Sequence, residues 1–378
     1  MRHEELYHTI EVKPKGLLAF FHLDTVLTFL ISMLTLFSIA VLWSASNHNT
    51  AYITSQALKI AAGFVIMVFI AFLPPERLKQ LTPIIYIVAL LLLLAVIFIG
   101  IEANGAYRWI DLKLFRFQPS EIAKLAVPMM VAYYLHKRKI PPTFFNVVGS
   151  LLLIALPVAL IFLQPDLGTA IIVLFSGIIV LFLGGLQWRY ILIAFGLIAI
   201  ALPSLWFFGM KEYQKDRVET FLNPELDPLG KGYQIIQSKI AIGSGGIYGK
   251  GWENSTQVSL QFLPEATTDF IYAIIGEEFG LIGSVLLLIC YLMIIWRGLY
   301  ISYHARDSFY QLVGGAVCLV FFFYVFVNTG MVSGVLPVVG VPLPFISYGG
   351  TSIMTLFISF GILMNIYSHP ASITKRIQ

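Results

Sequence analysis

The sequence predicts an all-α integral membrane protein that crosses the bilayer about ten times. Hydrophobic residues make up 58% of the 378 residues and charged residues only 12%, about half of the charged share in an average soluble domain. The mean hydropathy is +0.85 over the whole chain, which requires many apolar segments and not a single anchor. The net charge of +4 is small, so we expect no nucleic-acid partner.

Ten apolar segments come close to the roughly 20 residues that a transmembrane helix needs. They cover residues 23–43, 55–73, 82–101, 120–135, 145–163, 168–184, 188–207, 269–296, 310–330 and 349–367. An even number of spans places both termini on the same side of the membrane. We therefore predict that residues 1–378 form a single membrane domain, in which residues 208–268 form one large loop between spans seven and eight.

Basic residues predict which side of the membrane each loop occupies, because cytoplasmic loops concentrate Lys and Arg. With the N-terminus inside, the inner segments hold thirteen such residues and the short outer loops hold three. The thirteen are Arg2, Lys13, Lys15, Arg77, Lys79, Lys137, Arg138, Lys139, Arg189, Arg297, Arg306, Lys375 and Arg376, and the three are Arg108, Lys113 and Arg116. Both termini are therefore predicted to be cytoplasmic. The 208–268 loop is predicted to lie outside, where a reaction must use an already activated substrate.

The large outer loop ends on a carboxylate. Asp269 opens the apolar run of span eight, and an ionisable group where a helix enters the bilayer is costly unless it has a partner or a function. A helix cap is the simpler explanation, because Thr267, Thr268 and Asp269 are all good caps. Glu277 follows eight residues later, about 80° round the helix. Two carboxylates descending from the outer edge favour a polar cavity.

A second polar group precedes span four. Ser120 after Pro119 is typical of a helix N-terminus, which Glu121 in the first turn would stabilise. Glu121 and Lys124 are three residues apart, so they share a helix face and can pair. Two interpretations stay open: a surface ion pair beside a cap, or an outward-facing polar cavity whose charges orient a substrate. Arg108 lies in the same outer loop.

Three further features are candidates for a functional role. Asp166, in the segment Gln164–Gly168, is explained mainly by a tight outer turn with a helix cap. Residues 232–242 are predicted to form an amphipathic helix on the membrane surface, which would bring Lys239 near lipid phosphates. Residues 331–348 are apolar but rich in Pro and Gly. They are predicted to form a broken segment packed inside the protein.

Four motifs together resemble those of the SEDS family (shape, elongation, division and sporulation). They are Gln118-Pro119-Ser120-Glu121, Gln164-Pro165-Asp166-Leu167-Gly168, Leu263-Pro264-Glu265 with Thr268-Asp269-Phe270, and Pro342-Leu343-Pro344 with Ser347-Tyr348-Gly349-Gly350. The resemblance runs from about residue 20 to 367, with the motifs in order. Residues 227–230 and 242–252 look more like the RodA branch, which serves elongation and cell shape, than the FtsW branch, which serves division.

This resemblance implies a peptidoglycan glycosyltransferase of the bacterial inner membrane. Such an enzyme polymerises lipid II, the undecaprenyl-linked disaccharide-peptide precursor, on the outer face of that membrane. The family's essential acidic residue falls on Asp269, its acidic and basic pair falls on Glu121 and Lys124, and Ser347 belongs to the fourth motif. Family members work with a class B penicillin-binding protein, which crosslinks the new strand, and we expect other membrane proteins of the elongation complex as partners.

The candidate residues suit this chemistry. The donor sugar is already activated as a pyrophosphate, so no tightly bound cofactor is expected. The reaction needs a general base for the acceptor hydroxyl and positive charge for the departing pyrophosphate. Asp269 is the candidate base. The positive charge could come from Arg217, Lys239 or Lys124, or from a divalent cation, Mg²⁺ or Mn²⁺, near Asp269.

Other functions stay open from the sequence. A flippase for lipid II needs charges near the midplane and an alternating cavity. Apart from Lys59, Lys124, Glu277 and Glu278, the spans hold few central charges, and no inverted repeat is evident. A scaffold that only recruits the crosslinking enzyme is another alternative, and the division-type polymerase of the same family is a third.

Overall fold

The computed structural model describes residues 8–10, 21–103, 106–111, 116–204, 231–369 and 373–375. In these ranges each predicted span corresponds to a helix, and the prediction of an all-α membrane protein is confirmed. Seven helices are long and apolar enough to cross a bilayer: α2 (Thr25–Ala45), α3 (Thr50–Ala71), α4 (Pro75–Ile99), α6 (Phe144–Leu163), α12 (Ile271–Tyr303), α13 (Ser308–Val332) and α14 (Thr351–Ser368). Three have 17 residues each: α5 (Pro119–Leu135), α7 (Leu167–Leu183) and α8 (Trp188–Ser204).

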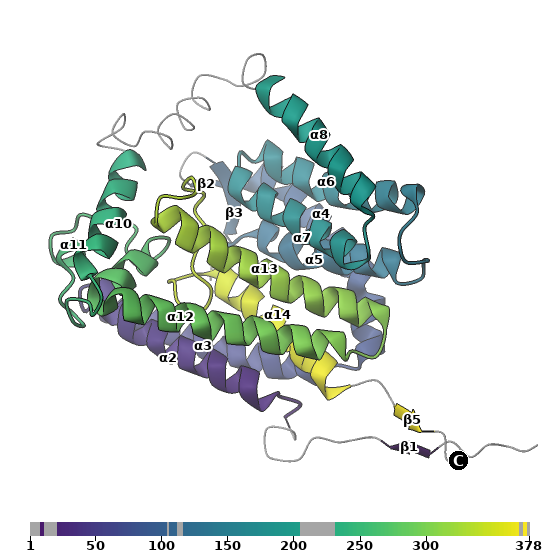
Figure 1. The fold of residues 1–378 in the computed structure, drawn as a ribbon, viewed down its shortest axis with the longest axis horizontal. Coiled ribbons are helices and arrows are strands. Elements are labelled where there is room, and N and C mark those ends of the chain that lie inside the picture. The colour runs from purple at the N-terminus through teal and green to yellow at the C-terminus, as the bar shows by residue number, and fades with distance from the viewer. Residues whose placement is uncertain are drawn as a thin grey trace, which may run out of the picture.

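The remaining elements are short and lie at the two ends of the helix bundle (Figure 1). At one end are α10 (Lys231–Gly245) and α11 (Thr256–Ser259), together with a small antiparallel sheet of β2 (Ile101–Ala103), β3 (Ala106–Asp111) and β4 (Arg116–Phe117). We call this the α10 end. At the other end β1 (His8–Ile10) pairs with β5 (Ile373–Lys375). The described parts of the two termini therefore lie side by side.

Two helices begin earlier than the hydropathy pattern predicts. Helix α3 begins at Thr50, not near residue 55, because the Asn49 side chain accepts a hydrogen bond from the N–H of Ala51 at 3.0 Å. Helix α4 begins at Pro75, not near residue 82, and its first turns carry charges. Glu76 and Lys79 pair there with Arg306 and Asp307, at 2.6 and 3.0 Å. These charged residues extend the helix beyond its apolar part.

Close packing of α3 against α14 depends on small residues at the crossing. A Cβ atom at Gly63 would lie 2.0 Å from the Phe357 ring, and one at Gly361 would lie 3.0 Å from both Ile70 and the Met67 carbonyl. Such contacts are the usual way in which membrane helices approach closely, since lipid provides little hydrophobic drive for association. Asn365 then joins the same two helices by donating to the Ile70 carbonyl at 3.1 Å.

The outer faces of the helices carry many exposed apolar side chains, as lipid contact requires. Helix α8 lies at the edge of the bundle (Figure 1), and its Leu192 and Phe195 are two-thirds exposed. Arg297 in α12 pairs instead with the buried Asp24 at the start of α2, at 2.7 Å. The arrangement of apolar faces and paired charges supports a multi-pass membrane protein.

The segment 333–350, between α13 and α14, is not helical, and its residues 341–347 run through the interior, in agreement with the broken segment predicted over residues 331–348. Leu343, Phe345 and Ile346 are all at most 1% exposed. The Ser38 hydroxyl donates to the Ile346 carbonyl at 2.9 Å, and the Tyr291 hydroxyl donates to the Pro344 carbonyl at 2.6 Å. These side-chain donors replace helix hydrogen bonds and hold the irregular backbone in one place.

Candidate active site

Helix α12 begins at the α10 end of the bundle (Figure 1), and Asp269 lies in the turn two residues before it. It does not cap the helix: the N-cap position is Phe270, and no side chain makes a capping hydrogen bond there. The turn is closed by the N–H groups of Thr268 and Phe270, which both donate to the Glu265 carbonyl at 3.1 Å. Phe270 is 1% exposed and fixes the turn to the core. The simpler explanation of Asp269 as a cap is therefore wrong.

The backbone on either side of Asp269 is tied to the neighbouring segment and to α13. The Ser347 hydroxyl donates to the Thr268 carbonyl at 2.5 Å, and the Tyr348 N–H donates to the Thr267 carbonyl at 2.9 Å. The Asn328 amide donates both to the Asp269 carbonyl at 2.9 Å and to the Val341 carbonyl at 2.7 Å. Asp269 is thus held in a fixed position by contacts to its main chain.

The Asp269 carboxylate itself is half-buried and has no hydrogen-bond donor or cation paired with it among the described residues. It faces Gly340, where an added Cβ would lie 3.4 Å from Asp269 Oδ2. Burial, and to a smaller extent the negative charge of Glu265, raises the pKa of Asp269 to about 6. A carboxylate with a raised pKa and no competing donor is suited to accept a proton from a substrate.

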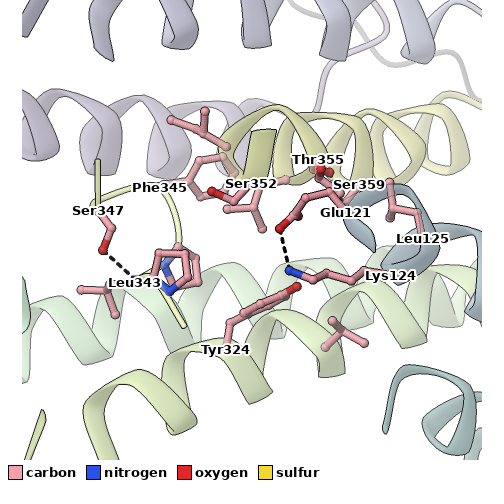
Figure 2. Close-up of a pocket in the computed structure, with 15 residues that line it drawn as sticks. Glu121, Lys124, Leu125, Tyr324, Leu343, Phe345, Ser347, Ser352, Thr355 and Ser359 are labelled. Atoms are coloured by element: carbon pink, nitrogen blue, oxygen red, sulfur yellow. Dashed lines mark hydrogen bonds and ion pairs between the residues drawn. The ribbon is translucent and has the colours of Figure 1, made fainter. Parts of the chain in front are cut away.

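Glu121 and Lys124 form a buried pair that lines a pocket. Lys124 Nζ lies 2.7 Å from Glu121 Oε1, and both side chains are 7% exposed. Figure 2 shows Lys124 between Glu121 and the hydroxyl end of Tyr324, and its ammonium lies 5.3 Å from the Tyr324 ring centroid. The surface-pair interpretation does not fit this burial, so the cavity interpretation is the one that the structure favours.

The pocket brings together α5, α13, α14 and the 333–350 segment. Its other lining residues are Leu125, Val320, Pro342, Leu343, Pro344, Phe345, Ser347, Ser352, Ile353, Thr355, Leu356 and Ser359. Asp269 is not in the lining. The link between them is Ser347, which lines the pocket (Figure 2) while its hydroxyl donates to the Thr268 carbonyl and accepts from the Leu343 N–H at 2.8 Å.

Sequence reasoning missed two residues of α13 that connect these groups. Tyr324 contacts Lys124, and Asn328 holds the main chain of Asp269. They are four residues apart and lie on the same helix face. The sequence did carry one signal for Asn328, because an amide side chain within an apolar span must find hydrogen-bond partners. In the structure Asn328 is 0% exposed. Nothing in the sequence marks Tyr324.

The structure places the other predicted site residues as follows. Asp166 caps α7 by accepting from the Thr169 N–H at 3.2 Å, and it also meets Arg108 Nε at 3.7 Å and Gln118 Nε2 at 3.4 Å. Lys239, in α10, is exposed and packs on Gly334, where an added Cβ would lie 2.7 Å from its ammonium nitrogen. Arg217 lies outside the described residues, as does the first part of the 208–268 loop.

Glu277 is not in the pocket. It is 0% exposed and receives hydrogen bonds from residues 250–257, which lead into α11. Glu278 is 1% exposed and accepts a hydrogen bond from Ser44. The prediction that Asp269 and Glu277 face a common polar cavity therefore does not hold for Glu277, because its carboxylate is used to hold residues 250–257 against α12.

A divalent cation near Asp269 stays a prediction. Among the described residues, no three His, Cys, Asp or Glu side chains come together as a metal site would need. Glu265 is the acidic neighbour of Asp269, and it is exposed.

Comparison with known proteins identifies the family. A family profile described as "Cell cycle protein", which covers FtsW, RodA and SpoVE, matches residues 18–372. The peptidoglycan glycosyltransferase MrdB of Escherichia coli K12 is 49% identical over 356 residues, covering 94% of this chain and 96% of MrdB. A probable peptidoglycan glycosyltransferase FtsW of Geobacter metallireducens is 37% identical, covering 91% of this chain and 94% of that protein.

Solved structures agree with the sequence comparison. A chain of a peptidoglycan synthase complex, described as coordinating polymerisation and crosslinking, superposes with a TM-score of 0.80 at 33% identity, covering 91% of this chain and 97% of that one. The crystal structure of the rod-shape-determining protein RodA of Thermus thermophilus gives a TM-score of 0.69 at 28% identity, covering 91% and 96%. The chain therefore belongs to the FtsW, RodA and SpoVE family of peptidoglycan glycosyltransferases, and within it to the RodA branch.

Proposed function

We propose that the protein polymerises lipid II into glycan strands during cell elongation, with Asp269 as the general base. The observation that carries this proposal is the state of the Asp269 carboxylate. Its main chain is fixed by Asn328 and its side chain is half-buried, with no donor among the described residues and a pKa of about 6. A general base works best when its pKa lies near the working pH.

The proposed step is a direct displacement at the anomeric carbon of the donor sugar. The acceptor hydroxyl gives its proton to the Asp269 carboxylate as its oxygen bonds to that carbon. The bond from the carbon to the pyrophosphate oxygen breaks, and undecaprenyl pyrophosphate leaves with the electron pair. One displacement inverts the anomeric centre, so an α-linked donor gives a β-linked glycan.

Positive charge near the leaving pyrophosphate would come from basic side chains around the site. Lys124 is already paired with Glu121 in the pocket, which supports a role in ordering the substrate more than in free anion capture. Lys239 is exposed at the α10 end and is available to an anionic headgroup. Arg217 stays a candidate outside the described residues.

The proposed orientation puts this site on the outer face of a bacterial inner membrane, with both termini cytoplasmic. Two observations support it. The pairing of β1 with β5 agrees with termini on a common side. The connection between α5 and α6, at the opposite end from α10, carries Lys137, Arg138 and Lys139, as expected for a cytoplasmic loop.

We further propose that the protein acts with a class B penicillin-binding protein that crosslinks the new strand, beside other membrane proteins of the elongation complex. The similarity to a chain of a solved peptidoglycan synthase complex supports a crosslinking partner.

The test is polymerisation of labelled lipid II by the purified full-length protein, alone and with its crosslinking partner. We expect glycan strands from the native protein. Asp269→Asn, which keeps the size of the side chain, should lower the rate about 10²–10⁴-fold, the usual cost of losing a general base. Transport of lipid II across vesicles without polymer, or full activity of Asp269→Asn, would contradict the proposal.

A further inference from the structure

Helix α12 is broken about two and a half turns after it begins beside the candidate base. Gly280 has φ 65° and ψ −160°, which is not helical. Residues 271–279 therefore form a short helix of their own, leading away from Asp269. In an unbroken helix the N–H groups of Leu281 and Ile282 would donate to the carbonyls of Glu277 and Glu278. All four of these groups need other partners.

The loop 246–251 provides these partners. The N–H groups of Lys250 and Gly251 donate to the carbonyls of Glu277 and Glu278, each at 3.0 Å. On the other side of the break, Leu281 N–H donates to the Gly246 carbonyl at 2.9 Å and Ile282 N–H to the Ile247 carbonyl at 3.2 Å. The loop thus joins the short helix to the rest of α12.

The Glu277 side chain fixes the same loop a second time. It is 0% exposed. Its carboxylate accepts from Lys250 Nζ at 2.6 Å, from the Ser255 hydroxyl at 2.5 Å, and from the hydroxyl and N–H of Thr256 at 2.6 and 3.0 Å. These donors fill the roughly four acceptor positions of a carboxylate. Glu277 therefore has no capacity left to bind a substrate.

The short helix is held at both ends. At the Asp269 end, the contacts from Ser347, Tyr348 and Asn328 fix the main chain of the turn. At the far end, Glu277 and the loop set the angle at which the helix leaves the break. The nine residues of this short helix span about 13 Å, so a tilt of about 5° would move Asp269 by about 1 Å. A shift of that size can cost about 100-fold in rate.

We propose that Glu277 is a positioning residue for Asp269, acting through the short helix 271–279 and the loop 246–257. The inference rests on the proposed function, because it concerns where the general base is held. Glu277 touches neither substrate nor base. Its charge and its hydrogen bonds keep the broken helix at one angle, so that the Asp269 carboxylate meets the acceptor hydroxyl correctly.

The test compares two variants of the full-length protein in lipid II polymerisation. Glu277→Ala removes every side-chain contact to the loop, and we expect kcat to fall about 10–100-fold with KM for lipid II within about twofold. Glu277→Gln keeps one acceptor oxygen for Ser255 or Thr256 but loses the negative charge that pairs with Lys250, so its kcat should lie between those of Ala and native. Glu253→Gln, an exposed carboxylate in the same loop, is the matched control and should be unchanged.

Hydrogen exchange supplies a readout that does not depend on activity. The amides of Leu281 and Ile282 should exchange faster in Glu277→Ala while most of the protein keeps its protection. If Glu277→Ala does not fold, Lys250→Met tests the inference instead, because it removes the ammonium and leaves the backbone hydrogen bonds of the loop. Lys250→Met should lower kcat and leave KM unchanged.

The outcomes separate this inference from the proposed function. A native protein that makes no polymer contradicts the proposed function. A native protein that polymerises, together with folded Glu277 variants of normal kcat, overturns the inference alone. A raised KM with unchanged kcat would also overturn it, since that pattern indicates a substrate contact.

Discussion

At the level of single residues, Asp269 holds a charge where burial disfavours it. Its ordinary pKa near 3.8 is raised to about 6, first by burial and then by the charge of Glu265. The folded protein therefore binds this proton more tightly than the unfolded chain does. The same property that makes Asp269 a usable base at neutral pH also makes its charged form destabilising.

The pH dependence follows with a definite sign. Below about pH 4 the group is protonated in both states and the shift has no effect on stability. As pH rises from about 4 to 6, the native protein loses stability relative to Asp269→Asn, and above about 6 the difference is constant. We expect Asp269→Asn to unfold at a higher temperature at pH 7.5 and at the same temperature near pH 4. Polymerisation by the native protein should fall as pH drops through 6. A stability difference that grows toward low pH would contradict the raised pKa.

The Glu121–Lys124 pair gives a second prediction. Because both side chains are buried, removing one partner leaves the other as an uncompensated charge, at a cost of about 3–5 kcal/mol. Glu121→Gln and Lys124→Met should each lower thermal stability and polymerisation, and the double variant should cost less stability than the sum of the two. Strictly additive effects in this double-mutant cycle would mean that the pair does not act as a unit.

Sequence reasoning found these residues but not always their roles. Asp269, Glu121 and Lys124 were recognisable because charges are costly beside apolar runs. Glu277 carried the same signal and was interpreted as a second cavity acid. Its role depends on Ser255 and Thr256, which reach it only because the loop folds back onto α12, and no local pattern indicates this return.

At the level of elements, the positions of the helices were predictable and their ends were not. Apolar runs gave a segment for each membrane helix, because a bilayer requires about 20 such residues. The first turns of α4 were missed because Glu76 and Lys79 are polar, although their partners on the neighbouring connection stabilise them. The break in α12 was also missed. A glycine within an apolar helix does not by itself indicate a break. The groups that pair with the free backbone N–H and carbonyl groups at the break lie about 30 residues earlier in the chain.

The loop that joins the broken helix gives a prediction at this scale. Gly249 has φ +80°, and an added Cβ would lie 2.1 Å from the Glu278 carbonyl oxygen. Since both the conformation and the contact involve backbone, Gly249→Ala should destabilise the protein by at least about 1–3 kcal/mol and lower polymerisation. Thermal unfolding in detergent measures the stability, and the lipid II assay measures the polymerisation rate.

Two neighbouring glycines are controls for this prediction. Gly243 lies within α10 with nothing within 4 Å of an added Cβ, so Gly243→Ala should be neutral or stabilise by about 0.5–1 kcal/mol. Gly246 has φ +57° but open space, so Gly246→Ala should cost only about 1–2 kcal/mol. Equal effects of the three substitutions would mean that the close contact at Gly249 has no importance.

For the whole molecule, two of the ion pairs and the basic α5–α6 connection lie at the end opposite α10. Lys79 with Asp307 and Arg306 with Glu76 join the first turns of α4 to the α12–α13 connection. Lys137, Arg138 and Lys139, between α5 and α6, lie at the same end, which the positive-inside rule predicts to be the cytoplasmic one. The chemistry proposed for Asp269 requires the other surface, where lipid II is available and nucleotides are not.

Cysteine labelling checks this orientation in cells. In a background without Cys290 and Cys318, which are both buried, a cysteine replaces either the exposed Asn254 near α11 or the exposed Lys139 between α5 and α6. We expect Asn254→Cys to react with a membrane-impermeant maleimide once the outer barrier of the cell is opened. Lys139→Cys should react only after the inner membrane is broken, because its loop carries the basic residues that stay in the cytoplasm. The reverse pattern would put Asp269 on the cytoplasmic side, away from the lipid II that it is proposed to polymerise.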